Sequence, residues 1–275
     1  MTKTNEFGQP IGDDLPVGWR EPIIPKREPM LGQYTRVEPL RIADHAQDLF
    51  IANQYDKTGE DWTYLGYGPF ESFTDYVAWL ETVCGSEDPM FWAYIDSNTD
   101  RAVGLGSYLR INPKVGSIEV GHLRFSPLMQ RTVLATEAMF LKMELAFSLG
   151  YLTYERKCDA LNIPSKRAAE RLGFKFEGIF RQATHYRGRN RDTALFSIID
   201  KYFAQFAISA LMSFSINNLR ATSSPAISSL ATLKPLPIPC LGIALILDLS
   251  IKSAILFGSN KSFFSNSETC LTLLS

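Results

Sequence analysis

Apolar and polar positions alternate along residues 33–40, which predicts a strand with one buried face. The spacing becomes helical further on, because Phe73, Val77 and Leu80 fall on one face of the segment 70–85. Across the rest of the chain, the same patterns predict helices at 41–55, 70–85, 132–149 and 162–172, and strands at 33–40, 90–96, 102–111, 117–125, 152–158, 174–183 and 192–202.

The connections between these segments indicate the fold class. The turns "SNTD" and "NPKVG" join the three central strands over so few residues that we expect a meander. Gly150 and Gly173 stop the two later helices, and Pro164 lies in the first turn of the last one. The order β-α-α-β-β-β-α-β-α-β-β therefore predicts an α+β domain, with a mixed, largely antiparallel sheet flanked by helices.

Two segments outside residues 33–203 differ in composition. Proline recurs five times in 1–32, which predicts an extended arm that either wraps the domain or joins two copies as a homodimer. Residues 204–275 hold only six of the 57 charged residues, and they contain 14 serines but neither Trp nor Tyr. We interpret this segment as translated out of frame. A disordered tail and an apolar docking segment are the alternatives.

Composition excludes several classes of protein. The net charge is −1, so no basic field points to nucleic acid. The cysteines and histidines are isolated, so we expect no metal site. Asp248 and Lys252 interrupt the apolar run 240–258, and charges at a bilayer centre are costly, so we expect no membrane span. The N-terminus lacks the apolar core of a secretory signal, and we expect a cytoplasmic protein.

The sharp turn between the strand at 117–125 and the next helix is a candidate binding site. A helix N-terminus has unpaired N–H groups and the positive end of a dipole, both of which suit an anion such as phosphate. Arg124 and Arg131 add positive charge beside it. The alternative is a capped helix start, with the side chain of Thr132 or Ser126 as the cap.

Two motifs resemble the GNAT acetyltransferase superfamily, with the likeness extending over residues 33–203. The first is the run 130–135, Gln-Arg-Thr-Val-Leu-Ala, which is similar to the family's Q/R-x-x-G-x-G/A except that Val133 replaces the first glycine. The second and more specific one is "NIPSKRAAERLGFKFEG" at 162–178. With "ATEA" at 135–138, these motifs are most similar to the ribosomal-protein alanine N-acetyltransferases.

The resemblance implies acetyl-CoA as the cosubstrate, with its pyrophosphate held by backbone amides of the turn. The residues that it places against acetyl-CoA are Leu123, Phe125, Gln130, Arg131, Thr132, Val133, Leu134, Ala135, Asn162 and Ser165. Glycine permits close approach of the backbone to phosphate, so Val133 bears on the affinity for the cofactor rather than on the fold. Asn162 is also expected to cap its helix.

Glu119 is the candidate general base that the resemblance implies, because it lies on the strand beside the cofactor. His122 has a suitable ordinary pKa, but strand alternation puts the two side chains on opposite faces unless a bulge intervenes. A third possibility is that water takes the proton and the enzyme mainly positions the acceptor.

The thiolate of CoA also needs a proton. Many relatives supply a tyrosine four residues before the glycine of the "GF" pair, but Ala169 occupies that position here. Ser165 is the alternative acid, or else a hydroxyl that only supports its helix. Trp62, Tyr64 and Tyr67 form either an acceptor pocket or core contacts, and the basic turn 187–191 is expected to be solvated, with an acidic acceptor or the CoA 3′-phosphate as possible contacts.

The reading with the most support is an N-acetyltransferase that moves the acetyl group of acetyl-CoA to a primary amine in a ternary complex. The acceptor is either a small molecule or a protein N-terminus. The alternative is a non-catalytic acyl-CoA-binding or scaffold protein, which Val133 and Ala169 favour.

Overall fold

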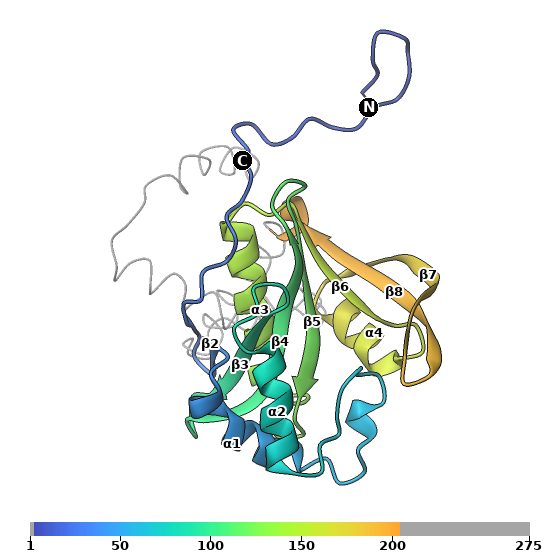
Figure 1. The fold of residues 1–275 in the computed structure, drawn as a ribbon. Helices are drawn as coiled ribbons and strands as arrows, with labels where there is room; N and C mark the ends of the chain where they lie inside the picture. The colour runs from blue at the N-terminus through green and yellow to red at the C-terminus, as the bar shows by residue number, and fades with distance from the viewer. Residues whose placement is uncertain (1–2, 204–275) are drawn as a thin grey trace, which may run out of the picture.

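The computed structural model describes residues 3–203, so the predictions made for 204–275 lie outside the described residues (Figure 1). The elements, in chain order, are β1 (Met30–Leu31), β2 (Thr35–Pro39), α1 (Ile42–Asn53), the 3₁₀ turn η1 (Glu60–Trp62), α2 (Phe73–Val83), β3 (Met90–Asp96), β4 (Arg101–Asn112), β5 (Ser117–Phe125), α3 (Val133–Ser148), β6 (Thr153–Asp159), α4 (Ile163–Arg171), β7 (Lys175–Tyr186) and β8 (Arg189–Ile199).

These elements confirm the predicted α+β class. Eight strands form one sheet in the order β1-β2-β3-β4-β5-β6-β8-β7, and every neighbouring pair is antiparallel except β5 and β6. The sequence patterns missed the short β1 and the 3₁₀ turn. They also made the last hairpin loop too long: Arg187 (φ 50°) and Gly188 (φ 69°) alone form the turn, as in the two-residue turns that match strand twist.

Helices cover both faces of the sheet (Figure 1). Neighbouring residues of β3 show the division, because Phe91 packs with Leu80 of α2, whereas Trp92 belongs to the core that contains Met139 of α3. This is the period of two expected for a strand buried on both sides. The molecule therefore has three layers: α1 and α2, then the sheet, then α3 and α4.

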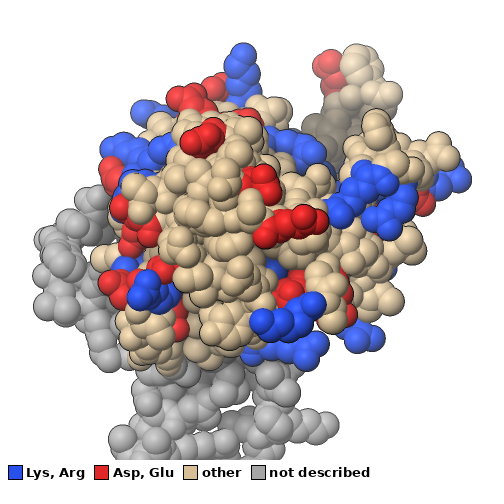
Figure 2. Space-filling model, turned by 60° about the horizontal axis from the view of Figure 1, so that its bottom comes forward, with Lys and Arg blue, Asp and Glu red and all other residues tan. Residues whose placement is uncertain are grey.

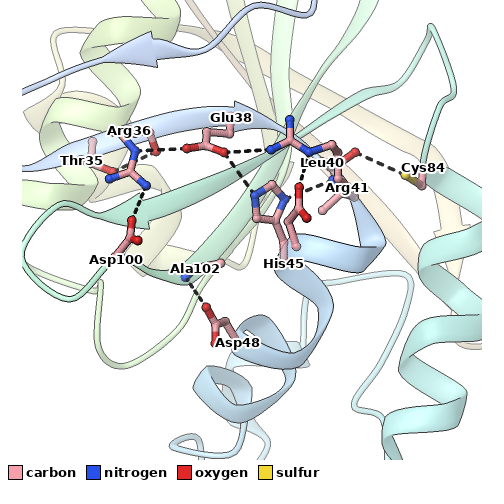
Figure 3. Close-up of polar contacts among 11 residues, drawn as sticks. Thr35, Arg36, Glu38, Leu40, Arg41, His45, Asp48, Cys84, Asp100 and Ala102 are labelled. Carbon is pink, nitrogen blue, oxygen red and sulfur yellow. Dashed lines mark hydrogen bonds and ion pairs between the residues drawn. The ribbon is translucent and has the colours of Figure 1, made fainter.

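The α1 layer is joined to the sheet by polar contacts around a buried histidine (Figure 3). His45 accepts a hydrogen bond at Nδ1 from the backbone N–H of Arg41 (3.1 Å), in place of a side-chain cap at the start of α1. Its Nε2 lies 3.4 Å from Oε2 of Glu38. Burial lowers the pKa of His45, so at neutral pH the ring is an uncharged acceptor.

The N-terminal arm lies along the domain over part of its length. Trp19 Nε1 donates to the carbonyl of Gly150 (2.9 Å), and the hydroxyl of Tyr151 donates to the carbonyl of Ile23 (3.3 Å). Residues before this stretch run beyond the end of the sheet (Figure 1). Within residues 3–203, no helix has the length and apolar character needed to cross a membrane.

The parallel pair β5 and β6 separates partway along its length, and this opening positions the site. Pairing runs from Ser117 opposite Thr153 to Val120 opposite Arg156 and then stops. Beyond this point β5 pairs only with β4, and β6 only with β8. Figure 1 shows the two strands diverging toward the start of α4. The inner edge of β5 beyond Val120 thus has no strand partner.

Candidate active site

A cleft of about 1880 Å³ begins where β5 and β6 diverge. The starts of α3 and α4 and the loop between α1 and α2 all line it. Leu123 and Phe125, expected to touch the cofactor, line it from β5. The molecular face in Figure 2 carries Lys and Arg next to Asp and Glu, so no patch of one charge dominates that face.

The N-terminus of α3 opens into this cleft without a side-chain cap. Thr132 occupies the cap position, but its hydroxyl donates to the carbonyl of Met129 (2.6 Å). Ser126, the other candidate cap, donates to the carbonyl of Val103. The prediction of a capped helix start is therefore wrong, because both hydroxyls turn back to nearby carbonyls. The first-turn N–H groups that follow have no intrahelical partner.

The turn forms without the expected glycine. Arg131 adopts the left-handed conformation (φ 60°), which costs a non-glycine residue roughly 1–2 kcal/mol. Val133 begins the helix, lines the cleft and keeps 53 % of its surface exposed. Leu134 and Ala135 follow it in the first turn, and both are buried. The backbone strain thus falls two residues before the position where relatives carry glycine.

Gln130 holds the turn in place with its side chain. Its Nε2 donates to Oδ2 of Asp61 (2.7 Å) and to the carbonyl of Phe125 (3.0 Å). Asp61 also accepts a hydrogen bond from Nη1 of Arg124 (3.1 Å). Arg124 is buried, and its guanidinium carbon lies 4.4 Å from the centroid of the Trp62 ring. The side chains of Gln130 and Arg124 are therefore engaged with the α1–α2 loop, whereas the exposed Arg131 and the backbone of the turn line the cleft.

The start of α4 is capped, unlike that of α3. Asn162 Oδ1 accepts the N–H of Ser165 (3.0 Å), which confirms the predicted cap. Ser165 Oγ accepts a hydrogen bond from Nη2 of Arg156 (2.9 Å). Ala169 is fully buried in the core, so the position where many relatives have tyrosine offers no acid group to the cleft.

Glu119 lies on the other side of the opening. Its side chain is buried, and its Oε2 lies 2.8 Å from Nη1 of Arg110 and 2.6 Å from Nζ of Lys157. Lys157 also bonds Glu155 (2.7 Å). Burial opposes the charged form of Lys157, but the hydrogen bonds to these two carboxylates outweigh it and raise the pKa of Lys157. Glu119 is thus held between two cations at the cleft wall.

A bulge in β5 decides where His122 points. Leu105 pairs with Arg124 and Ser107 with Gly121, so three steps on β5 oppose two on β4. His122 has a φ of 50°, its ring stacks on Phe91, and its Nδ1 lies 2.8 Å from Ser107 Oγ. The bulge therefore brings His122 to the α1–α2 face of the sheet, in the same cleft as Glu119. Burial lowers the pKa of His122 to about 4.

The aromatic loop makes core contacts and also contributes residues to the cleft. Trp62 is buried against Arg124, whereas Tyr64 and Tyr67 line the cleft. Tyr67 stacks on Trp79 with ring centroids 4.3 Å apart, and its hydroxyl donates to the carbonyl of His122 (3.0 Å). The loop therefore packs on the domain and also forms part of the cleft wall.

The basic turn between β7 and β8 holds this loop. Arg187 donates to the carbonyls of Leu65 and Tyr67, each at 3.0 Å, and Arg189 lies 3.4 Å from the carbonyl of Thr63. Residues 187–190 are exposed, as expected for a solvated turn, and the side chains of Arg187 and Arg189 also hold the loop. Nothing in the local spacing announced these contacts, because they join residues more than a hundred positions apart.

Sequence reasoning also missed Arg156. This arginine is buried and lines the cleft from β6. The signal was present, because Tyr154, Arg156 and Cys158 share one phase of the strand, and both neighbours in that phase are buried. A charged residue in the buried phase of a strand is rare enough to mark a site. Among residues 3–203, no group of three or more His, Cys, Asp or Glu side chains is placed to bind a metal ion.

These features define a class of protein. A splayed pair of parallel strands beside an uncapped helix N-terminus provides a slot for an elongated, partly anionic ligand, with titratable groups on the opposite wall. The family described as the acetyltransferase (GNAT) domain matches residues 36–175, about half of the chain. The chain belongs to this acetyltransferase family.

Solved structures agree with this assignment. A GCN5-related N-acetyltransferase from Brucella melitensis is 41 % identical, with 67 % of this chain and 84 % of that chain covered and a TM-score of 0.66. A GNAT-family structure from Chromobacterium violaceum ATCC 12472 is 37 % identical, with coverages of 71 % and 99 % and a TM-score of 0.66. The microcin C7 self-immunity acetyltransferase MccE, solved with acetyl-CoA and AMP, is 19 % identical, with coverages of 60 % and 92 % and a TM-score of 0.53. No curated protein matches the chain.

Proposed function

We propose that this protein is an acetyl-CoA-dependent N-acetyltransferase that transfers the acetyl group directly to a primary amine in a ternary complex. The observation that carries the proposal is the uncapped start of α3 beside the unpaired edge of β5, with Glu119 lining the same cleft. Open amides at a helix N-terminus suit the pyrophosphate of CoA. The unpaired backbone of β5 suits the amides of the pantetheine arm.

The cofactor contacts divide between backbone and side chains. Val133, Leu134 and Ala135 offer backbone N–H groups at the start of α3, with Arg131 and Thr132 completing the turn. Leu123 and Phe125 flank the pantetheine arm on β5, while Asn162 and Ser165 flank it on α4. MccE, a relative in fold, was solved with acetyl-CoA.

The chemistry follows from the groups on the opposite wall. The amine nitrogen attacks the thioester carbon, the carbon–sulfur bond breaks, the amine gives up a proton, and the CoA thiolate takes one up. Glu119 is the base, directly or through a water molecule, because its carboxylate lies in the cleft within reach of an acceptor. His122 is the alternative base. The low pKa of His122 keeps the ring neutral at pH 7, but its Nδ1 contacts Ser107.

The acceptor is a small molecule or a protein N-terminus that presents a primary amine. The motif at 135–138 favours the ribosomal-protein alanine N-acetyltransferase branch. The non-catalytic alternative rested on Val133 and Ala169, and the open amides at α3 weaken the first of these arguments. We also propose a cytoplasmic location and keep a homodimer as a hypothesis.

Two measurements on the full chain test this function. Acetyl-CoA should raise the melting temperature, since a ligand that binds only the native state stabilises it by mass action. A panel of polyamines, amino sugars and short peptides with free N-termini should then reveal which amine releases CoA thiol. If millimolar acetyl-CoA gives no thermal shift, the proposal is wrong. Binding without thiol release from any amine would favour the non-catalytic alternative.

A further inference from the structure

Arg156 is a buried cation whose charge no carboxylate balances. Its side chain is 6 % exposed, and none of the ion pairs among residues 3–203 includes it. The groups that act on it electrostatically are Cys158, Tyr154, Tyr94 and Arg171. A buried charge without a partner is costly, and packing alone gives no reason to keep it. Arg156 also lines the cleft, at the last residue where β6 still pairs with β5.

A hydrogen bond from the Arg156 guanidinium bears on how Ser165 can act. Arg156 Nη2 donates to Ser165 Oγ at 2.9 Å. A hydroxyl oxygen that accepts such a bond keeps its own proton free to donate elsewhere. The N–H of Ser165 is held by Asn162, so the residue is fixed at the start of α4 at two points. Its proton is then available to the thiol of Cys158, with which the hydroxyl also interacts, or to a ligand atom in the cleft.

Other polar groups around Arg156 also lack partners. The hydroxyls of Tyr94 and Tyr154 are buried and make no hydrogen bond. Both lie close enough to Arg156 for the cation to act on their ionisation, and burial raises the pKa of each well above its usual value. The thiol of Cys158 completes the surroundings on β6, and burial raises its pKa too. All these neighbours are neutral at pH 7, so the positive charge of Arg156 is not cancelled.

We propose that Arg156 is a positioning residue for Ser165 and that the two together stabilise the CoA thiolate, in place of the tyrosine that many relatives have at the position of Ala169. This inference rests on the proposed function. When the carbon–sulfur bond breaks, the electron pair stays on sulfur. The hydroxyl of Ser165 donates a hydrogen bond to that sulfur, the adjacent guanidinium stabilises the negative charge, and a water molecule supplies the proton as CoA leaves.

The experiment measures the pKa of the CoA thiol when CoA itself is bound to the full chain. Thiolate absorbance in the ultraviolet, followed against pH, reports this value without any acceptor. The bound thiol should titrate about 1 to 3 pH units below the free thiol, as expected for an acid beside a cation. In Arg156→Gln and in Ser165→Ala, the thiol pKa should return toward its value in free CoA.

Two further variants separate this role from a structural one. Arg156→Lys keeps the charge but loses the planar guanidinium, and it should restore part of the shift. Arg171→Gln removes a neighbouring cation that binds Thr136 instead, and it should leave the shift unchanged. If Arg156→Gln does not fold, as judged by its melting curve, Ser165→Ala carries the test, because it removes only one hydroxyl.

The outcomes are distinct. If CoA binds and its thiol pKa is the same in the wild type, Arg156→Gln and Ser165→Ala, the inference is overturned while the proposed function stands. If CoA does not bind to the wild type, the proposed function itself fails. With acetyl-CoA and an accepted amine, Arg156→Gln should lower kcat by roughly 10²-fold with a smaller change in KM, the pattern for a group that acts on developing charge.

Discussion

The two walls of the cleft use their charges in different ways. On the acceptor wall, the buried charges are paired: Glu119 lies between Arg110 and Lys157, and Arg124 pairs with Asp61. On the cofactor wall, positive potential is left unbalanced, in the open amides of α3 and in the guanidinium of Arg156. One wall thus holds a catalytic carboxylate in place, and the other retains positive charge for a polyanionic ligand.

The two helix starts on the cofactor wall repeat this contrast at smaller scale. Both α3 and α4 present a positive dipole end to the cleft. Asn162 closes the start of α4, while Thr132 leaves the start of α3 open by bonding backward to Met129. A helix N-terminus is therefore not a binding site by default. It becomes one where the cap residue turns its side chain away.

The largest effect should come from the acceptor wall. Glu119→Gln removes the base but keeps the shape, so kcat should fall roughly 10²–10⁴-fold. The affinity for acetyl-CoA, measured by calorimetry, should change little, because the carboxylate acts on the acceptor. Glu155→Gln is a matched control, since it also bonds Lys157 but is not the base. Equal losses of kcat in both variants would remove Glu119 from the mechanism.

The next effect should come from the open helix start. Thr132→Asp places a capping carboxylate at α3, which would occupy its amides and repel a diphosphate. The affinity for acetyl-CoA should fall about tenfold or more, from roughly 1–2 kcal/mol of lost interaction. Asn162→Asp adds the same charge to a start that is already capped, so its affinity should fall less. Equal losses in the two variants would contradict the contrast between the helices.

Protonation of His122 on the acceptor wall should lower the stability of the fold in acid. The pKa of His122 in the fold is about 4, below its usual value near 6.5. The unfolded chain therefore binds the extra proton first, so stability is fully present above pH 6.5 and is lost as the pH falls toward 4. For this one group, the loss is at most about 3 kcal/mol.

Melting curves at pH 4.5 and 7.5 measure this effect. His122→Gln should show a smaller difference in melting temperature between the two pH values than the wild type does. Burial also lowers the pKa of His45, so His45→Gln is needed to separate the two contributions. An unchanged difference in His122→Gln would show that the ring is not a buried neutral group.

A smaller effect is expected at the closed helix start. Asn162→Ala removes the cap of α4 and should destabilise the domain by about 1 kcal/mol, measured by denaturant titration. Asn162→Ser, which restores a capping oxygen, should recover most of this loss. If Asn162→Ala leaves the stability unchanged, the cap contributes nothing to the fold.

The smallest effect is expected outside the described residues. Phe203 stacks on Phe147 of α3 with ring centroids 4.8 Å apart, so a chain that ends there keeps this contact. Removal of 204–275 should leave the acetyl-CoA affinity and the cooperative unfolding transition unchanged. Loss of the transition would contradict both the proposed domain boundary and the out-of-frame reading.

Local pattern was enough to predict most of the fold. The periods of two and 3.6 residues predicted the helices and the long strands, because side chains repeat with those periods when one side is buried. Asn162 was predictable as a cap from its place before a helical run. The cofactor-binding role of the slot beside α3 and the role of Glu119 as base were both inferred from a resemblance in motifs, and both remain predictions.

Tertiary structure decided what depends on contacts between distant residues. The bulge that brings His122 into the cleft arises from the pairing of β5 with β4, and no local pattern encodes it. The meeting of Arg156 with Ser165 requires β6 and α4 to pack together. Thr132 looked like a cap by residue type, but a hydroxyl can bond either forward or backward, and here it bonds backward to the carbonyl of Met129. Sequence determined the elements, whereas packing decided which polar groups were paired and which were left open to a ligand.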